Sequence, residues 1–205
     1  MDMYSVVKEN PILAILRNIP LEYTVDYAQA ISFFEVALNS EHGLKQIAIL
    51  RDRFGEKCMI GAGTAISVDL AKAAIGAGAQ FLLTPGTPID VLQYCAKKDI
   101  MLLPGVFTPG DVATSLEFGY KTMKLFPAGC APKGYLKALK GPYDEANYIA
   151  IGGVTIDNIN DYFKEGYMGV GLASNLMPLS VLKDKNWDLG VSYVQKYVSR
   201  VKRRV

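Results

Sequence analysis

Short apolar or β-branched runs recur along the whole chain at nearly even spacing, and this periodicity restricts the fold more than any other feature. The runs have centres about 20 to 26 residues apart, and they cover residues 12–16, 33–38, 59–61, 81–83, 101–103, 122–125, 148–151 and 169–171. The segments between them keep helical spacing, as at Leu70, Ala73, Ala74 and Ala77. Each repeat therefore predicts one strand and one helix joined by short loops.

Eight similar βα units, without a linker or a change in composition, predict an α/β fold: a single (β/α)8 TIM barrel that forms one domain over residues 1–205. A broken or partial barrel would give much the same pattern. The 205 residues stand at the small end of the range for such barrels but suffice to bury a full core. Val191, Val194, Val198 and Val201 indicate the last helix.

Charge and cysteine content exclude several classes of partner. The chain carries 22 Lys and Arg against 20 Asp and Glu, so its net field gives no reason to expect nucleic acid or a membrane as a partner. Cys58, Cys95 and Cys130 have no paired spacing, and no stretch is apolar enough for a membrane helix, which predicts a cytoplasmic protein. His42 is the lone histidine, so we expect no catalytic zinc.

Lys124 interrupts an apolar strand run. In a barrel of this type the active site lies at the carboxyl ends of the strands, and Lys124 stands near such an end with apolar neighbours on both sides. An ammonium group withdrawn from water has a lowered pKa, and a partly neutral lysine can condense with a ketone. The alternative is a lysine that reaches solvent along its apolar stem or forms an ion pair.

Glu35 is a second charge inside an apolar run. Burial would raise the pKa of its carboxyl group toward the range useful for general acid and base catalysis. The alternative is a structural salt bridge with Arg17 or Lys124. Both interpretations are compatible, because the three strand ends would face one cavity.

Glycine turns follow several strand runs. Backbone N–H groups in such turns can approach an anion closely, as in residues 61–64 and in Gly152, Gly153 and Val154. The loops after the seventh and eighth strands commonly bind phosphate in this fold, and residues 171–174 supply the second of them. A phosphate site is therefore expected there.

The chain also resembles a known family along nearly its whole length. The motifs that carry the resemblance are Ala14-Ile15-Leu16-Arg17, Glu35-Val36-Ala37-Leu38-Asn39-Ser40, Ile60-Gly61-Ala62-Gly63-Thr64, Pro104-Gly105, Lys124-Leu125-Phe126-Pro127 and Gly152-Gly153-Val154. In this order they are similar to the class I aldolases that act on 2-dehydro-3-deoxy-6-phosphogluconate or its galactonate epimer, a family that includes 4-hydroxy-2-oxoglutarate aldolases.

The resemblance implies that Lys124 forms a Schiff base and that Glu35 shuttles protons during release of pyruvate and glyceraldehyde 3-phosphate. It also implies a homotrimer that needs no metal and no other cofactor. The remaining matched positions are Arg17 and Thr64, which help to hold the substrate, Pro85 and Phe126 around the imine, and Gly152, Gly153, Val154 and Ser174 in the phosphate loops.

Within the family the signals are mixed. Asn39 replaces an arginine of the gluconate type, and Ile151, a matched substrate-binding position, replaces a threonine. Both substitutions look like the galactonate type, whereas residues 137–143 resemble the gluconate type. Gly129 stands where a glutamate or serine is usual, and Ala173 replaces a glycine of the last phosphate loop.

Two other functions fit the same residues. A phosphate-binding barrel isomerase would use Glu35 as a base and Lys124 only electrostatically, and a non-catalytic homologue would bind a sugar phosphate without cleaving it. Covalent capture of a ketone by Lys124 distinguishes both from the aldolase.

One connection in the sequence is unusually short. Residues 24–31 predict the first helix after a strand, yet Phe33 already begins the next strand, and the glycine-containing turn of the family is missing. Either this helix is shortened, or a segment is absent from the chain between Ala30 and Phe33. We favour the second explanation.

Overall fold

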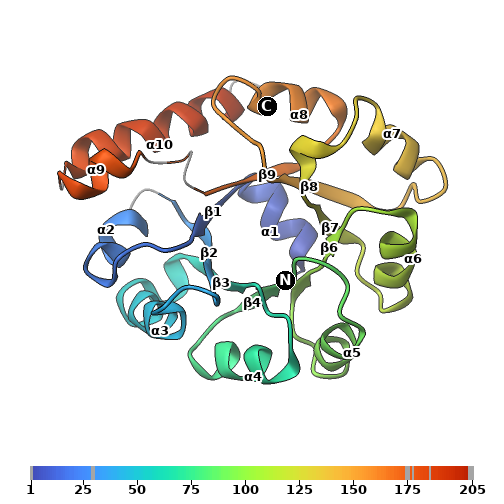
Figure 1. Cartoon of the computed structure of the whole chain (residues 1–205), viewed down its shortest axis with the longest axis horizontal. Coiled ribbons are helices and arrows are strands. Elements are labelled where there is room, and N and C mark those ends of the chain that lie inside the picture. The colour runs from blue at the N-terminus through green and yellow to red at the C-terminus, as the bar shows by residue number, and fades with distance from the viewer. Residues whose placement is uncertain (1, 29–30, 174–175, 177, 185, 203–205) are drawn as a thin grey trace.

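The strands form one parallel sheet that curls into a ring, with helices around it (Figure 1). The computed structural model describes residues 2–28, 31–173, 176, 178–184 and 186–202. Nine strands pair in the order β5-β4-β3-β2-β1-β9-β8-β7-β6. They are β1 (Ile12–Leu16), β2 (Phe33–Ala37), β3 (Met59–Gly63), β4 (Phe81–Leu83), β5 (Leu102–Leu103), β6 (Gly105–Val106), β7 (Thr122–Leu125), β8 (Asn147–Ile151) and β9 (Gly169–Leu172).

The sequence prediction of a β/α barrel is confirmed, with one difference in the fifth strand. The sequence indicated a single run over residues 101–103, whereas the chain forms β5 and β6 on either side of Pro104. Proline has no N–H group to donate to a neighbouring strand. β5 pairs with β4 and β6 pairs with β7, so the peptide at Pro104 joins the two edges of the sheet.

Helices occupy the connections between strands, as the spacing predicts. They are α1 (Met3–Glu9), α2 (Thr24–Ala28), α3 (Gly43–Phe54), α4 (Val68–Gly76), α5 (Ile89–Lys97), α6 (Pro109–Glu117), α7 (Tyr135–Lys140), α8 (Ile159–Glu165), α9 (Leu179–Lys183) and α10 (Trp187–Lys202). The described 3-10 turns are η1 (Leu21–Tyr23), η2 (Gly55–Lys57) and η3 (Ala128–Cys130). Thr108 and Asp111 form a capping box at the start of α6, which fixes where that helix begins. None of the described helices combines the length and apolarity needed to cross a membrane.

The helix after β1 is shorter than predicted. The described part of α2 covers Thr24–Ala28, and Ile31 is not helical. The Ile31 N–H group donates to the Ala28 carbonyl, with N and O 3.4 Å apart, before β2 begins at Phe33. Residues 29 and 30 lie outside the described part of the chain. The first of the two explanations, a shortened helix, therefore matches the described residues, and the absence of a segment stays a prediction.

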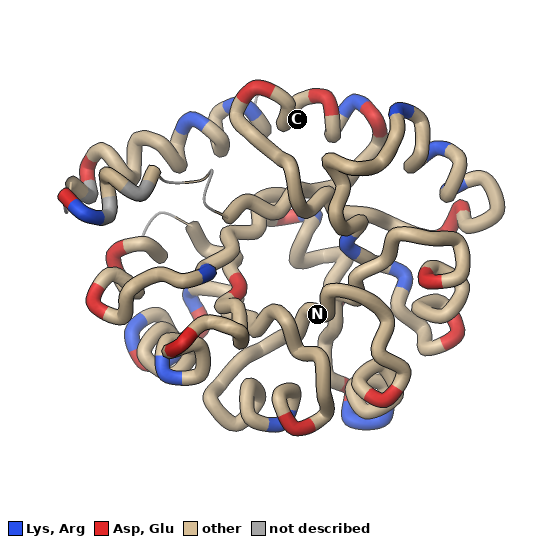
Figure 2. The backbone as a smooth tube through the Cα atoms, viewed as in Figure 1, with Lys and Arg blue, Asp and Glu red and all other residues tan. Residues whose placement is uncertain are grey.

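Alternation along the strands separates two apolar cores. Side chains such as Leu16, Val36 and Leu125 pack outward against the helices. Their strand neighbours point into the ring and form a second core with α1: Met3, Val6, Val7, Leu13, Ile15, Phe33, Phe81, Leu83, Leu103, Ile149 and Ile151. Lys, Arg, Asp and Glu lie mostly on the outer helices (Figure 2).

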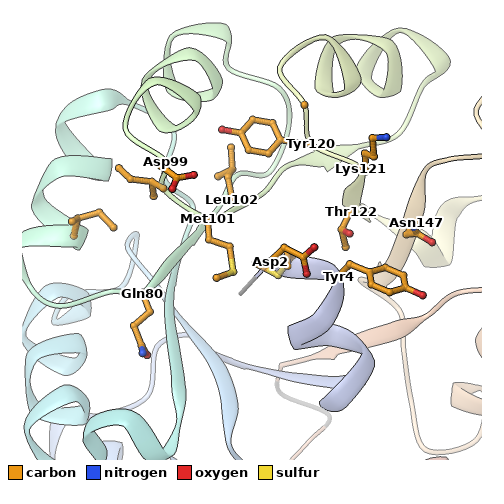
Figure 3. A pocket seen from close by; sticks show the side chains of 14 residues that line it. Asp2, Tyr4, Gln80, Asp99, Met101, Leu102, Tyr120, Lys121, Thr122 and Asn147 are labelled. Atoms are coloured by element: carbon orange, nitrogen blue, oxygen red, sulfur yellow. The ribbon is translucent and has the colours of Figure 1, made fainter.

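α1 closes the ring at the amino ends of the strands. Met3, Val6 and Val7 are buried against the inner core, and α1 crosses the centre of the ring in Figure 1. A cavity of about 670 Å³ lies beside this helix, between its N-terminus and residues at the starts of β4, β5, β7 and β8. Figure 3 shows Asp2, Met101, Lys121 and Thr122 around this hollow.

Replacement of Gly61 by alanine tests the inner packing. A methyl group there would lie 2.3 Å from Cζ of the buried Phe81 ring, so we expect Gly61→Ala to lower the free energy of unfolding by about 1–3 kcal/mol. Gly76→Ala is the matched control, because a methyl group at the end of α4 meets no atom within 4 Å. Denaturant unfolding followed by circular dichroism measures both, and equal stability of the two variants would contradict the packing argument.

Candidate active site

Lys124 points into the ring from β7, between two side chains that point outward. Its outward neighbours Met123 and Leu125 belong to the helix-facing core, and Lys124 itself is 6% exposed. Its Nζ atom lies 5.3 Å from the centroid of the Phe126 ring. Among the described residues, no carboxylate oxygen lies within 4.0 Å of this amine. The amine is therefore buried without being locked into an ion pair.

Burial lowers the pKa of Lys124, the carboxyl group of Glu35 opposes this shift, and the Arg17 guanidinium adds to it. The net direction is downward from the ordinary value. A lysine in this state has a larger neutral fraction at a given pH, and the neutral amine is the nucleophile.

Glu35 enters the same interior from β2 and is 3% exposed. Its side chain fits because Gly63 on β3 has no Cβ atom, and a methyl group there would lie 1.8 Å from Oε2. Burial raises the pKa of Glu35, while Lys124 and Arg17 oppose the shift. Within the described part of the chain, Oε2 is buried without a hydrogen-bond partner. Such an atom is available to a proton or a hydroxyl group of a ligand.

Two strand ends near this pair have unusual backbone geometry. Thr64, directly after β3, has φ +62°, which is rare for a β-branched residue. Asn18, directly after Arg17, has φ +54°, and its N–H group donates to the Ser40 hydroxyl at 3.0 Å. Backbone strain of this kind is often found at functional sites, and the roles of Arg17 and Thr64 stay predictions.

A cavity of about 200 Å³ opens at the carboxyl ends of β1, β8 and β9. Gly152 and Gly153 adopt φ +90° and +84° there, a conformation that exposes backbone groups in a tight turn. The cavity is lined by Ile15, Arg17, Phe126, Ile151, Gly152, Gly153, Val154, Gly171 and Ala173. The predicted phosphate loops and the Phe126 side of the imine pocket therefore share one hollow.

Among the predicted site residues that the structure describes, Lys124, Glu35, Thr64 and Pro85 do not line this hollow. Thr64 and Pro85 lie at the same end of the barrel but do not line it. The Pro85 backbone instead packs against Gly105, where a methyl group would come within 2.5 Å. Ser174 falls outside the described residues. Among those that are described, no group of three His, Cys, Asp or Glu could hold a metal ion.

Sequence reasoning missed residues that shape the site without chemistry of their own. Ile15 lines the cavity two positions before Arg17, and period-2 alternation could have indicated it. Gly129, whose N–H group donates to the Gly152 carbonyl at 2.8 Å, allows η3 to approach the Gly152–Gly153 turn. A methyl group at Gly129 would lie 3.0 Å from Cα of Gly153. A larger residue at this position would therefore require the glycine turn to shift.

A buried amine and a buried carboxyl group inside a parallel β/α barrel, whose carboxyl end carries a glycine turn, are the features of a lysine-dependent barrel enzyme. Comparison with known proteins identifies which one. The family model "KDPG and KHG aldolase" matches residues 3–191, so the chain belongs to this family and is an aldolase.

Individual relatives agree with the family. The chain is 30% identical over 194 residues to 2-dehydro-3-deoxy-6-phosphogalactonate aldolase of Escherichia coli K12, covering 91% of this chain and 94% of the relative. It is 31% identical over 181 residues to 2-dehydro-3-deoxy-phosphogluconate aldolase of Pseudomonas aeruginosa, covering 86% and 81%. A similar solved structure is a KDPG aldolase of Legionella pneumophila with pyruvate captured as a covalent carbinolamine intermediate. Its TM-score is 0.86 at 28% sequence identity, and the match covers 93% of this chain and 95% of that one.

The electrostatics of Lys124 can be tested without assuming a reaction. Acetylation of Lys124 by acetic anhydride should rise with pH through a midpoint below the ordinary 10.5. Glu35→Gln removes a carboxylate that raises the pKa of Lys124, so the midpoint should move lower still, whereas Arg17→Gln should move it higher. Peptide mass spectrometry measures the extent at each pH. Shifts of the same sign in both variants would refute the arrangement.

Proposed function

We propose that this aldolase cleaves 2-dehydro-3-deoxy-6-phosphogluconate, or its galactonate epimer, reversibly to pyruvate and glyceraldehyde 3-phosphate. The main support for this reaction is the buried Lys124 amine, which has a lowered pKa and lies in the same interior as the buried Glu35 carboxyl group. The relatives named for each epimer support the substrate class.

The first half of the reaction forms the imine. The neutral Nζ atom of Lys124 attacks the C2 ketone, and the resulting carbinolamine loses water to give a protonated imine. The Phe126 ring beside the amine keeps that side of the site apolar, which favours loss of water. The cationic imine then accepts the electron pair of the bond between C3 and C4.

The second half removes a proton from the C4 hydroxyl group and later adds one at C3. Glu35, directly or through a water molecule, takes the C4 hydroxyl proton as the bond between C3 and C4 breaks and the aldehyde leaves. The enamine takes a proton at C3 to become the pyruvate imine. Water then hydrolyses this imine, releasing pyruvate and regenerating the amine. The raised pKa of Glu35 suits both proton transfers.

Substrate binding is assigned to the strand ends. Arg17 and Thr64 hold the carboxylate and the pyruvyl group, and Pro85 with Phe126 surrounds the imine. Gly152, Gly153 and Val154, with the loop that contains Ser174, hold the phosphate.

Ile151 is the residue that bears on the choice of epimer. It is 4% exposed and contributes a branched apolar wall to the cavity, where it offers no hydrogen bond to a hydroxyl group. By resemblance, an apolar residue at this position looks like the galactonate type. Comparison of kcat/KM for the two phosphorylated substrates decides the preference.

The working form that we propose is a cytoplasmic homotrimer. The family resemblance implies this assembly. A solved protein cage that covers 96% of this chain was designed by fusing symmetric oligomeric domains, which is consistent with an oligomer.

Lys124→Met should abolish cleavage, because the thioether keeps the volume of the side chain but cannot form an imine. Lys121→Met is the control, since Lys121 is 63% exposed and pairs with Glu145 just before the same strand. Pyruvate release measures turnover, and borohydride reduction with pyruvate followed by peptide mass analysis locates the adduct. An adduct elsewhere, or none, would reject the mechanism and favour an isomerase or a binding protein.

Glu35→Gln separates imine formation from cleavage. The amide has nearly the shape of the carboxyl group but cannot accept the C4 hydroxyl proton, so cleavage should fall by about 10²–10⁴-fold. Trapping of pyruvate on Lys124 by borohydride should persist. Unchanged cleavage in this variant would remove Glu35 from the proton-transfer step.

A further inference from the structure

Tyr27 lies on α2 in the helix layer, yet its hydroxyl group contacts a loop of the carboxyl-end cavity. The hydroxyl donates to the backbone carbonyl of Ala173 at 3.3 Å, across 146 positions in the sequence. Ala173 lines the cavity opposite Gly152 and Gly153. The contact therefore connects the second helix to the loop that follows β9.

Tyr27 is 3% exposed, so its hydroxyl group is costly to bury without a partner. Burial raises the pKa of this phenol well above its ordinary value, with a further contribution from Tyr197. A neutral phenol is a donor, which a carbonyl oxygen requires. The apolar ring alone would fill the space as phenylalanine, and the hydroxyl group adds only the bond to Ala173.

A second tyrosine contacts the other loop of the cavity. Tyr197 on α10 is 4% exposed, and it forms a hydrogen bond with the backbone of Ile156, which opposes the rise in its pKa that burial causes. Arg200, one turn later, donates to the Ile156 carbonyl. α10 therefore holds the segment after β8 through two side chains.

Hydrogen bonds of Asn158 connect the segment around Ile156 to the Gly152–Gly153 turn. Asn158 accepts from the Thr155 N–H group at 2.7 Å and donates through its side-chain amide to the Gly153 carbonyl at 2.9 Å. A carbonyl oxygen held this way cannot turn toward an anion in the cavity, where it would repel a phosphate oxygen. The same holds for Ala173 under the Tyr27 hydroxyl.

We propose that Tyr27 and Tyr197 are positioning residues that hold the two loops of the phosphate subsite from the helix layer. The proposal rests on the proposed function, because it takes the cavity beside Gly152 and Gly153 to receive the substrate phosphate. Neither tyrosine touches the substrate. Tyr27 keeps the Ala173 carbonyl away from the phosphate. Tyr197, through its hydrogen bond with the Ile156 backbone, holds the segment from which Asn158 binds the Gly153 carbonyl.

The variant that tests this is Tyr27→Phe, which keeps the buried ring and removes only the hydroxyl group. Tyr120→Phe is the matched control, because the Tyr120 hydroxyl donates to the Leu92 carbonyl at 3.1 Å at the amino end of the barrel, away from the cavity. Both variants lose one hydroxyl-to-carbonyl bond. Any difference in substrate binding between the two variants then comes from the position of the loop at Ala173, because both variants have lost one such bond.

The KM for the phosphorylated substrate should rise about threefold to tenfold in Tyr27→Phe, with kcat little changed. The KM for the same 2-dehydro-3-deoxy sugar acid without its phosphate should not change, nor should the rate of pyruvate trapping by borohydride. Tyr120→Phe should match the unsubstituted protein in all three. Tyr197→Phe should reproduce the selective effect, since it releases the other loop.

The affinity for inorganic phosphate, measured by calorimetric titration, should fall in Tyr27→Phe and stay unchanged in Tyr120→Phe. This measurement needs no cleavage, so it tests the loops even if the unsubstituted protein cleaves neither substrate, a result that would reject the proposed function alone. An equal rise of KM for both substrates, no change in either, or unchanged phosphate affinity would overturn the positioning role.

Discussion

The withdrawal of Lys124 and Glu35 from water is the constraint on which the rest of the structure depends. Each charge is costly in an apolar interior. Burial favours the neutral form of both groups, whereas the charge on each group favours the charged form of the other. The outcome is a carboxyl group with a raised pKa and an amine with a lowered pKa in one interior. A barrel supplies this environment because strands that are distant in sequence direct side chains into one closed interior. Arg17, at the rim, adds positive charge without occupying that interior.

Glycines determine where the interior has room. Gly61 and Gly63 on β3 leave space for Phe81 and Glu35, and Gly171 on β9 leaves space for Ile151. Large side chains therefore face small ones across adjacent strands, which is how a narrow barrel is filled. α1 packs against the inner core at the amino end, and the cavity lined by Arg17 and Phe126 opens at the carboxyl end.

The sequence predicts the parts that depend on local repetition. Spacing located the strands, and Lys124 and Glu35 stood out as charges within apolar strand runs. Period-2 alternation left Lys124 facing either the barrel interior or the helix layer, and the structure shows that it faces the interior. The break in the fifth strand has a local signal, because Pro104 directly follows the predicted run and has no N–H group to donate. Two other features have none. The helical pattern continues through Ile31 although Ile31 is not helical, and the bond from Tyr27 to Ala173 joins residues 146 positions apart. The positive φ of Thr64 is likewise set by its surroundings, because threonine does not favour it.

Cavity volume alone would have misplaced the site. The hollow of about 670 Å³ at the amino end is lined by Lys121, and the smaller one of about 200 Å³ lies at the other end of the same strands. Lys121 and Lys124 stand three positions apart along the chain. The hydrogen bond to Glu145 raises the pKa of the exposed Lys121, so that amine stays protonated, whereas burial lowers the pKa of Lys124. Desolvation thus separates the two amines, because Lys121 lies exposed before β7 whereas Lys124 lies buried within it.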